Sequence, residues 1–214
     1  LLVAHGASED ILVEVHPHIG SNKLPQIIQN IRQTITQHGG EIHFNHFVDD
    51  FVLNNNTIQA VRANGTNHTI RHLILATGHS ARDIFELLDR KKIEIECKDF
   101  ALGVRIEHPQ SLIDFIQYKQ SPRQHNLPAA PYALSCQVDA KGVFSFCMCP
   151  GGLIVPSATS PGEIVVNGMS LSRRDSPYAN SGMVTSVDKI DFAPFNKFKS
   201  LQGMYFQQSV EQKV

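Results

Sequence analysis

The sequence predicts an α/β (α+β) fold: a partial α/β domain with parallel strands and a β-meander, followed by a β-rich second domain. Three observations predict it. An apolar pattern with helical spacing between residues 24 and 35 ends at two glycines and leads into a short strand, which is typical of a parallel αβ step. A continuous apolar run at residues 73–76 indicates a strand buried on both faces. From residue 100 onward, strand-like segments separated by turn residues dominate.

Composition and charge exclude several classes of protein. The 214 residues include 19 basic and 20 acidic ones, so the net charge of -1 provides no field for nucleic acid or an anionic membrane. No apolar run approaches the roughly 20 residues of a membrane span. Four cysteines do not make a disulfide framework in a chain of this size, so we expect a reducing, cytoplasmic setting. The chain starts at Leu1 without a signal peptide, and we expect it to be an internal piece of a longer protein.

Residues 1–92 are expected to form the partial α/β domain. The expected elements are a helix between Ser21 and Gly39, a short strand at residues 41–45, a β-meander with strands at 47–53 and 57–63, and a helix at 81–90. Asn64-Gly65 is a strong hairpin signal, because both turn positions need a positive φ angle. The meander would deliver the chain into the buried strand at residues 73–76.

The centre of this domain is the stretch His72–Arg82, in which the buried strand meets the next helix. Thr77-Gly78 forms the turn, and the glycine there lets another backbone or a ligand come close. Ser80 is placed to cap the following helix. His79 follows the turn, where a bound ring could meet it, and Arg82 could hold an anion or simply be solvated. A strand-to-helix turn without a ligand fits these residues equally well.

Residues 93–192 are expected to form the β-rich second domain, which begins in a charged linker at residues 91–98. Its expected strands lie at residues 101–107, 132–138, 143–149, 163–169 and 183–187, and a helix begins at Pro109. Residues 170–182 are predicted to be a polar loop, in which Arg173-Arg174 is most simply solvated. Residues 193–214 are expected to form a terminal helix.

The most unusual stretch is Cys147-Met148-Cys149-Pro150-Gly151-Gly152. On a regular strand the two cysteines share one face, so both sulfur atoms would point the same way. They could be small buried core residues, redox or active-site thiols, or metal ligands. No second Cys or His pair lies at zinc spacing, so no metal site is expected. The Pro-Gly-Gly sequence would also let a ligand approach the backbone closely.

Other polar residues are weaker candidates. Arg105 and His108 lie at the end of a predicted strand, as a pair that binds an anion or a substrate would, although an ordinary exposed strand end explains them as well. His16 and His18 bracket a proline in a loop, where a surface or packing role is expected. The chain contains no Gly-x-Gly, so it lacks the phosphate-binding turn of a complete dinucleotide-binding domain.

Five motifs occur in order along the chain, at residues His16–Leu24, Leu75–Asp83, Gly103–Pro109, Phe144–Gly152 and Val166–Ser170. Together they resemble bacterial FAD-dependent dehydrogenase-like flavoproteins, often described as NAD-utilising or uncharacterised FAD-dependent dehydrogenases. The resemblance covers nearly the whole chain. It implies a protein more than twice this long, in which an amino-terminal Gly-x-Gly-x-x-Gly segment and a carboxy-terminal FAD segment, both missing here, complete the flavin site.

The resemblance also implies roles for individual residues. The candidate FAD-binding residues, at and beside the family's flavin-side turn, are Ala76, Thr77, Gly78 and His79. The candidate catalytic residues, which would face the flavin from the second domain, are Cys147, Cys149, Arg105 and His108. NAD(P)H is a candidate co-substrate.

Two functional hypotheses follow. In the first, the chain is an internal fragment of an FAD-dependent oxidoreductase that transfers hydride through the flavin to or from a small molecule. The fragment alone is then expected to be inactive and without FAD, because the phosphate-binding turn is elsewhere. In the second, the chain is a non-catalytic ligand-binding or interaction module of flavoprotein ancestry. The sequence leaves open the substrate, the choice of NADH or NADPH, and the oligomeric state.

Overall fold

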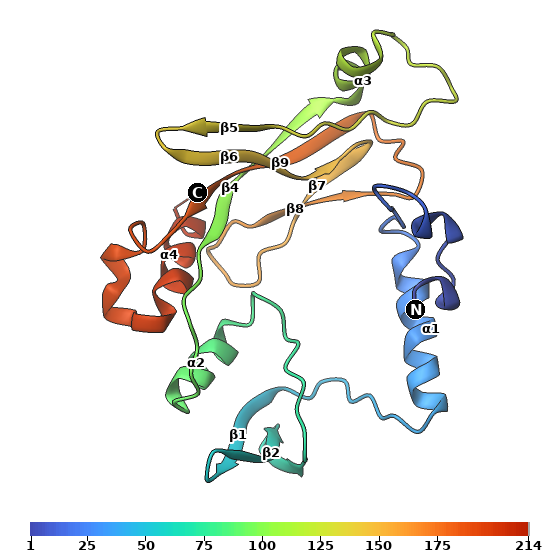
Figure 1. The fold of residues 1–214 in the computed structure, drawn as a ribbon. Coiled ribbons are helices and arrows are strands. Elements are labelled where there is room, and N and C mark those ends of the chain that lie inside the picture. Colours follow the sequence, from blue (N-terminus) through green and yellow to red (C-terminus); the bar gives the residue numbers. More distant parts are fainter. Residues whose placement is uncertain (214) are drawn as a thin grey trace.

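A computed structural model describes residues 1–213 and has an α+β architecture built on three antiparallel sheets (Figure 1). The elements, including the 3-10 helices η1 to η3, are in chain order η1 (Val3–His5), η2 (Glu9–Leu12), α1 (Leu24–Gln37), β1 (Val48–Asn54), β2 (Thr57–Ala63), β3 (Thr66–Thr69), α2 (Arg82–Arg90), β4 (Phe100–Pro109), α3 (Gln110–Tyr118), β5 (Ser135–Val138), β6 (Lys141–Cys149), β7 (Gly152–Pro156), β8 (Val166–Ser170), β9 (Tyr178–Val187), η3 (Ala193–Leu201) and α4 (Gln202–Glu211).

The first sheet is the predicted meander, with the strand order β1-β2-β3. Its turns follow from local sequence: Asn55 and Asn56 have positive φ angles in the first, and Asn64 and Gly65 have them in the second. Helix α2 packs on this sheet through a small core of Phe51, Ile84 and Leu87. The meander and both helices α1 and α2 are therefore confirmed.

The main sheet has the order β4-β9-β6-β5, and all its pairs are antiparallel. Helix α3 begins directly after β4, with Pro109 as its N-cap residue, and packs Ile113 against Ala130 and Ala179. Strands β7 and β8 form a third, two-stranded sheet. Figure 1 shows this pair beside β9, between the main sheet and α1.

The central strand β9 corrects the prediction of a polar loop at residues 170–182. Ala179, Asn180, Ser181 and Gly182 are small or polar, so they carry no strand signal, yet they pair with β4 on one side and with β6 on the other. Asn180 and Ser181 are 0% exposed. Asn180 Oδ1 accepts from Arg105 and the Ser181 hydroxyl donates to the Phe146 carbonyl, whereas Asn180 Nδ2 is buried without a hydrogen-bond partner among residues 1–213.

The parallel strands expected from the sequence are not found among residues 1–213, where every strand pair is antiparallel. Residues 73–76 have no strand partner, and Ile74 is 91% exposed. The expected strand at 41–45 is also irregular. A continuous apolar run shows that both faces of a segment are suited to burial, but a strand also needs a neighbour for its backbone hydrogen bonds. Ser80 does not cap α2, whose N-cap residue is Ala81.

The carboxy-terminal segment is two helices, η3 and α4, with a kink at Lys199, rather than one. Val214, the last residue of the predicted helix, lies outside the described residues.

Polar contacts connect this segment to α2, notably through Arg82, which pairs with both Glu163 and Glu211. Burial would raise the pKa of Glu163, but hydrogen bonds from Gln208 and Arg82 outweigh it and lower that pKa. Arg82 is thus a structural bridge and not a solvated side chain.

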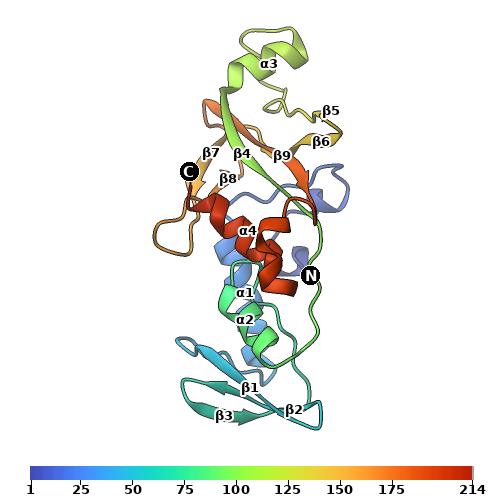
Figure 2. The same ribbon diagram turned by 90° about the vertical axis from the view of Figure 1, so that its left-hand side faces the viewer.

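The molecule is open and elongated. Figure 2 shows α3 at one end and the β1-β2-β3 sheet at the other. The accessible surface is 14806 Å², whereas a compact monomer of this mass has about 9,900 Å². Much of the excess is apolar, including Leu24, Ile28 and Ile35 on one face of α1. So much exposed apolar surface is characteristic of an interaction surface.

No helix within residues 1–213 is long and apolar enough to cross a membrane.

Candidate functional site

Most of the sequence motifs converge on one cavity of about 740 Å³, here called the cysteine cavity. Its walls come from residues 16–18, from 131–133, from Ser145 and 147–150 at the end of β6, and from Ser170 and Arg174. Segments more than 100 residues apart therefore share one site. A volume in this range suits a small organic molecule.

A β-bulge at the end of β6 separates the two cysteines. Phe146 pairs with Gly182 and Cys149 pairs with Asn180. Two residues of β6, Cys147 and Met148, therefore lie opposite the single residue Ser181 of β9. Cys147 takes up the irregularity with a φ angle of 46°. As a result Cys147 is exposed and Cys149 is buried, which corrects the expectation that both side chains share a face as they would on a regular strand. Both still line the cysteine cavity.

Arg105 holds the bulge in place. Its Nη1 donates to the carbonyl of Cys147 at 3.0 Å and to Oδ1 of Asn180 at 2.7 Å. Gly168 on β8 makes room for this guanidinium, because a Cβ there would lie 2.1 Å from Nη1. The partners of Arg105 are both neutral, so its positive charge is not cancelled by these contacts. Three of the five motifs thus meet at this residue.

His108 and Tyr132 form a second polar pair beside the cavity. His108 Nε2 lies 2.7 Å from the Tyr132 hydroxyl, and the two rings are edge to face with centroids 5.6 Å apart. Burial raises the pKa of Tyr132 above its ordinary value of 10.0, although Ser181 and Arg105 act in the opposite direction. The Tyr132 hydroxyl therefore carries its proton at neutral pH and can donate it.

Close backbone contacts fix the loop at residues 170–174 against the cavity. The Ser21 N–H donates to the Ser170 carbonyl at 3.1 Å, and His18 Nε2 lies 3.0 Å from the Leu171 carbonyl. Gly151, with a φ angle of 53°, lets the Arg174 carbonyl approach so closely that a Cβ would lie 1.8 Å from it. The Pro-Gly-Gly sequence therefore admits another backbone at this point, where the sequence analysis expected a ligand.

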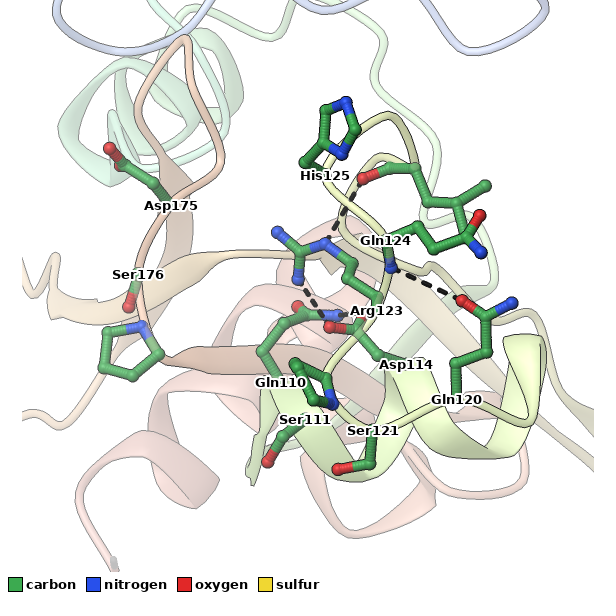
Figure 3. Close-up of a pocket in the computed structure, with 13 residues that line it drawn as sticks. Gln110, Ser111, Asp114, Gln120, Ser121, Arg123, Gln124, His125, Asp175 and Ser176 are labelled. Carbon is green, nitrogen blue, oxygen red and sulfur yellow. Dashed lines mark hydrogen bonds and ion pairs between the residues drawn. The ribbon is translucent and has the colours of Figure 1, made fainter.

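A buried polar network supports the wall formed by residues 131–133. Figure 3 shows Asp114 and Gln110 of α3 with Arg123 against the Asp114 carboxylate. Asp114 also accepts from the Ala130 N–H at 2.9 Å and from Gln110 at 2.8 Å. Gln110 Oε1 in turn accepts from the Gly151 N–H at 2.7 Å. One network thus positions both the turn before Tyr132 and the glycine against which Arg174 rests.

The four candidate catalytic residues belong to connected parts of this site, whereas the candidate FAD-binding residues lie elsewhere. Residues 76–79 are exposed. Gly78 has a φ angle of 81°, and a Cβ there would meet nothing within 4 Å. His79 lines a second cavity of about 690 Å³, which extends over residues 95–102 and over α4. Strand β4 contributes to both regions, with Phe100 at the second cavity and Arg105 at the first.

The different settings of the cysteines predict different reactivity. Burial raises the pKa of the Cys149 thiol above its ordinary value of 9.0, and the nearby Cys147 adds to this effect. We expect iodoacetamide to label the exposed Cys136 and Cys147 first and Cys149 last in the native protein, because the thiolate is the reactive form. Peptide mass spectrometry over a time course would measure this, with labelling in urea as the control. Equal native rates for Cys147 and Cys149 would contradict it.

Several site residues carried no usable signal in the sequence. Tyr132, Asn180, Gln110 and Asp114 are brought together by strand pairing and loop packing rather than by spacing. Arg174 was expected to be solvated, but it is half-buried and its Nε is buried without a hydrogen-bond partner among residues 1–213. No group of three or more His, Cys, Asp or Glu in the described part of the chain is arranged to hold a metal ion.

Comparisons with known proteins place these residues in a family context. The family model described as "FAD-dependent protein, C-terminal domain-like" matches residues 99–214. A protein of Clostridium beijerinckii, described as an uncharacterized protein, is 41% identical to this chain over 212 residues. The match covers 98% of this chain and 39% of that relative. The chain therefore spans about two fifths of the length of the relative it matches.

Proposed function

This chain belongs to the family of FAD-dependent proteins, C-terminal domain-like, and from that premise we propose that it is the substrate-facing part of an FAD-dependent oxidoreductase. The observation that supports the proposal is the cysteine cavity, because residues of three motifs line it. Cys147 and Cys149 belong to its walls, and Arg105 and His108 contact wall residues through the Cys147 carbonyl and Tyr132. The reaction proposed is hydride transfer between a small organic substrate and the flavin, with NAD(P)H as the second substrate. The four free cysteines suit a reducing, cytoplasmic setting.

The turn at residues 76–79 has two properties that suit contact with a flavin. Gly78 adopts a left-handed conformation that favours glycine, and open space surrounds it. No backbone hydrogen bond of the described structure engages the N–H groups of Thr77 and Gly78, which leaves them free for a ligand. Thr77 and Gly78 would hold one edge of FAD, and His79 would lie beside it. The phosphates would be held by polypeptide outside these 214 residues, because the chain has no Gly-x-Gly turn.

When bound, FAD would supply the hydride acceptor and donor chemistry, and the protein would supply orientation and electrostatics. Tyr132 has a protonated hydroxyl at the cavity wall and a hydrogen-bonded partner in His108. We assign this pair the transfer of a proton between substrate and solvent. Arg105 acts as a positioning residue, since it holds the Cys147 carbonyl and Asn180. Cys149 is buried with a raised thiol pKa, which favours packing over a nucleophilic role.

The open shape of the chain is consistent with packing against further helices and strands of a longer polypeptide. The apolar face of α1 and the apolar residues at 73–75 are exposed. In the proposal, these surfaces are covered by the remaining parts of the FAD-binding domain in a polypeptide about as long as the Clostridium beijerinckii relative. Isolated from those parts, the chain is expected to bind FAD weakly and to be inactive.

The proposal is tested by purifying the full-length protein that contains this sequence and measuring its visible flavin absorbance, with NADH and NADPH added separately as reductants. We expect bound flavin that one of the two nucleotides bleaches. A preparation that stays colourless after FAD is added would contradict the proposal. Bound flavin that neither nucleotide nor any tested substrate reduces would favour the non-catalytic binding module.

A matched pair of glycine variants tests the assignment of the turn. Gly78→Ala is expected to weaken FAD binding about tenfold or more, because the added Cβ meets no protein atom within 4 Å and would project toward the ligand. The positive φ angle also strains alanine at this position, and the control variant carries the same strain. Gly65→Ala is the control, since Gly65 has a similar φ angle of 79° and equally open surroundings in the β2–β3 turn. The measurement is flavin content and titration of the apoprotein. Equal flavin affinity in the two variants would remove the turn from the site.

A further inference from the structure

The cysteine cavity carries positive charge without a compensating carboxylate in its lining. Arg174 contributes this charge to its walls, and no Asp or Glu of the described residues lines it. Arg105 lies behind the Cys147 bulge and bonds only to neutral oxygen atoms. A cavity lined in this way favours an anionic ligand over a neutral or cationic one.

Arg174 lines this cavity, and its guanidinium lacks a hydrogen-bond acceptor among residues 1–213. Its Nε is buried and has no hydrogen-bond partner, and Arg174 forms no ion pair within the part of the chain described here. Asp10 and Glu14 line a neighbouring hollow that Arg174 also reaches, but neither pairs with it. The two Nη atoms are not among the buried unpaired atoms, so an anionic group in the cavity can reach them and gain a charge-assisted hydrogen bond.

The backbone holds Arg174 at the cavity. Its φ angle is 51°, a left-handed value that a side-chain-bearing residue adopts only when its surroundings impose it. The surroundings here are Gly151, against which the Arg174 carbonyl rests, and the contacts of residues 18–22 with the loop. The backbone that carries the Arg174 side chain is therefore fixed at the cavity, and the planar guanidinium matches a carboxylate in two parallel hydrogen bonds.

We propose that the cysteine cavity binds a small carboxylic acid with an apolar body, and that Arg174 receives the carboxylate. This names the substrate class of the proposed oxidoreductase and so rests on that proposed function. The body of the ligand lies against Pro17, Tyr132 and Met148, which supply apolar surface to the cavity walls. Tyr132 lines the same cavity, so its hydroxyl is the proposed proton donor or acceptor for this ligand.

The test compares two probes of nearly equal shape, benzoate and its neutral analogue benzamide, by isothermal titration and by protein NMR without added flavin. Benzoate is expected to bind about tenfold or more tightly than benzamide. Arg174→Gln is expected to abolish this preference while leaving benzamide binding unchanged, and Arg174→Lys is expected to restore part of it. Arg173→Gln on the same loop is the matched control, because Arg173 is exposed and does not line the cysteine cavity.

Several results would overturn the inference. They are the absence of saturable benzoate binding, equal binding of the two probes, or an equal effect of Arg173→Gln and Arg174→Gln. Circular dichroism of each variant shows that a loss is not caused by unfolding, and the Lys variant keeps the test informative if the Gln variant is unstable. Because the measurement needs no flavin, it can fail while the full-length protein still binds and reduces FAD, so failure of the inference is distinct from failure of the proposed function.

Discussion

Asp114→Ala is expected to destabilise the protein by about 3–5 kcal/mol, the usual cost of removing one partner from a buried ion pair. The carboxylate is 4% exposed and accepts from the Arg123 guanidinium, the Gln110 amide and the Ala130 N–H. Its removal leaves the buried Gln110 amide and the buried Ala130 N–H without this acceptor, and it leaves the Arg123 side chain, which is 29% exposed, without its ion-pair partner. Since domains of this size have net stabilities of about 5–15 kcal/mol, the loss is a large fraction of the total.

Chemical denaturation by urea, followed by circular dichroism, would measure this effect. Asp175→Ala is the matched control, because Asp175 lines with Asp114 the pocket shown in Figure 3 but is exposed and forms no ion pair within residues 1–213. We expect its effect to stay within about 0.5 kcal/mol. Asp114→Asn should be intermediate, because an amide oxygen can still accept from the Ala130 N–H. Similar losses for Asp114→Ala and Asp175→Ala would show that the network contributes little.

The pKa of Asp114 gives this prediction a pH dependence. Burial would raise the pKa, but the hydrogen bonds from the Ala130 N–H, from Arg123 and from Gln110 outweigh it and hold the pKa below its ordinary value of 3.8. A carboxyl group whose pKa is lower in the folded state stabilises the protein above its unfolded pKa and loses that contribution as the pH falls through the folded value. The difference in the free energy of unfolding between the original protein and Asp114→Ala should therefore have its full value above about pH 5 and decrease below about pH 4.

Gly151→Ala is expected to cost about 3 kcal/mol or more and to displace the loop that carries Arg174. The new Cβ would lie 1.8 Å from the Arg174 carbonyl oxygen and 2.2 Å from its carbon, so the backbone of one segment must move. The φ angle of 53° adds strain for alanine. Because this contact positions Arg174, the variant should also lose the preference for benzoate over benzamide.

Gly162→Ala separates the two causes in the same measurement. Gly162 has a φ angle of 77°, but a Cβ there meets nothing within 4 Å, so only conformational strain of about 1 kcal/mol is expected. Thermal or urea unfolding of both variants gives the difference, and benzoate titration reports the position of Arg174. If Gly151→Ala were no more destabilising than Gly162→Ala, the close contact between Gly151 and the loop would not exist in solution.

Local patterns in the sequence were enough for the elements whose signals lie within a few residues. The apolar face and terminal glycines predicted α1, the asparagine and Asn-Gly turns predicted the meander, and Pro109 marked the start of α3. These signals work because a helix or a tight turn is decided by neighbouring φ and ψ angles. The cysteine-rich stretch and the pair Arg105 and His108 were also found from sequence as candidates, and their catalytic roles stay predictions.

Two segments whose strand character depends on distant partners were predicted wrongly, although β4 and β6, which also pair with a distant strand, were predicted correctly. Residues 73–76 had the composition of a buried strand and lie unpaired, whereas residues 178–182 had the composition of a loop and form the middle of the main sheet. Composition records which environment suits a side chain, but a strand exists only where another strand supplies hydrogen bonds. Sequence spacing alone does not specify which segments meet.

By itself, the sequence therefore determined the class of fold, the local elements, the absence of the phosphate-binding turn and the five motifs that resemble flavoproteins. Only the tertiary structure decided that Cys147 and Cys149 are separated by a bulge, that Arg82 joins two carboxylates far along the chain, and that Arg174 rests on Gly151 at the cysteine cavity. The reason is physical: each of these features is a contact between segments whose separation in the chain carries no information about their distance in space.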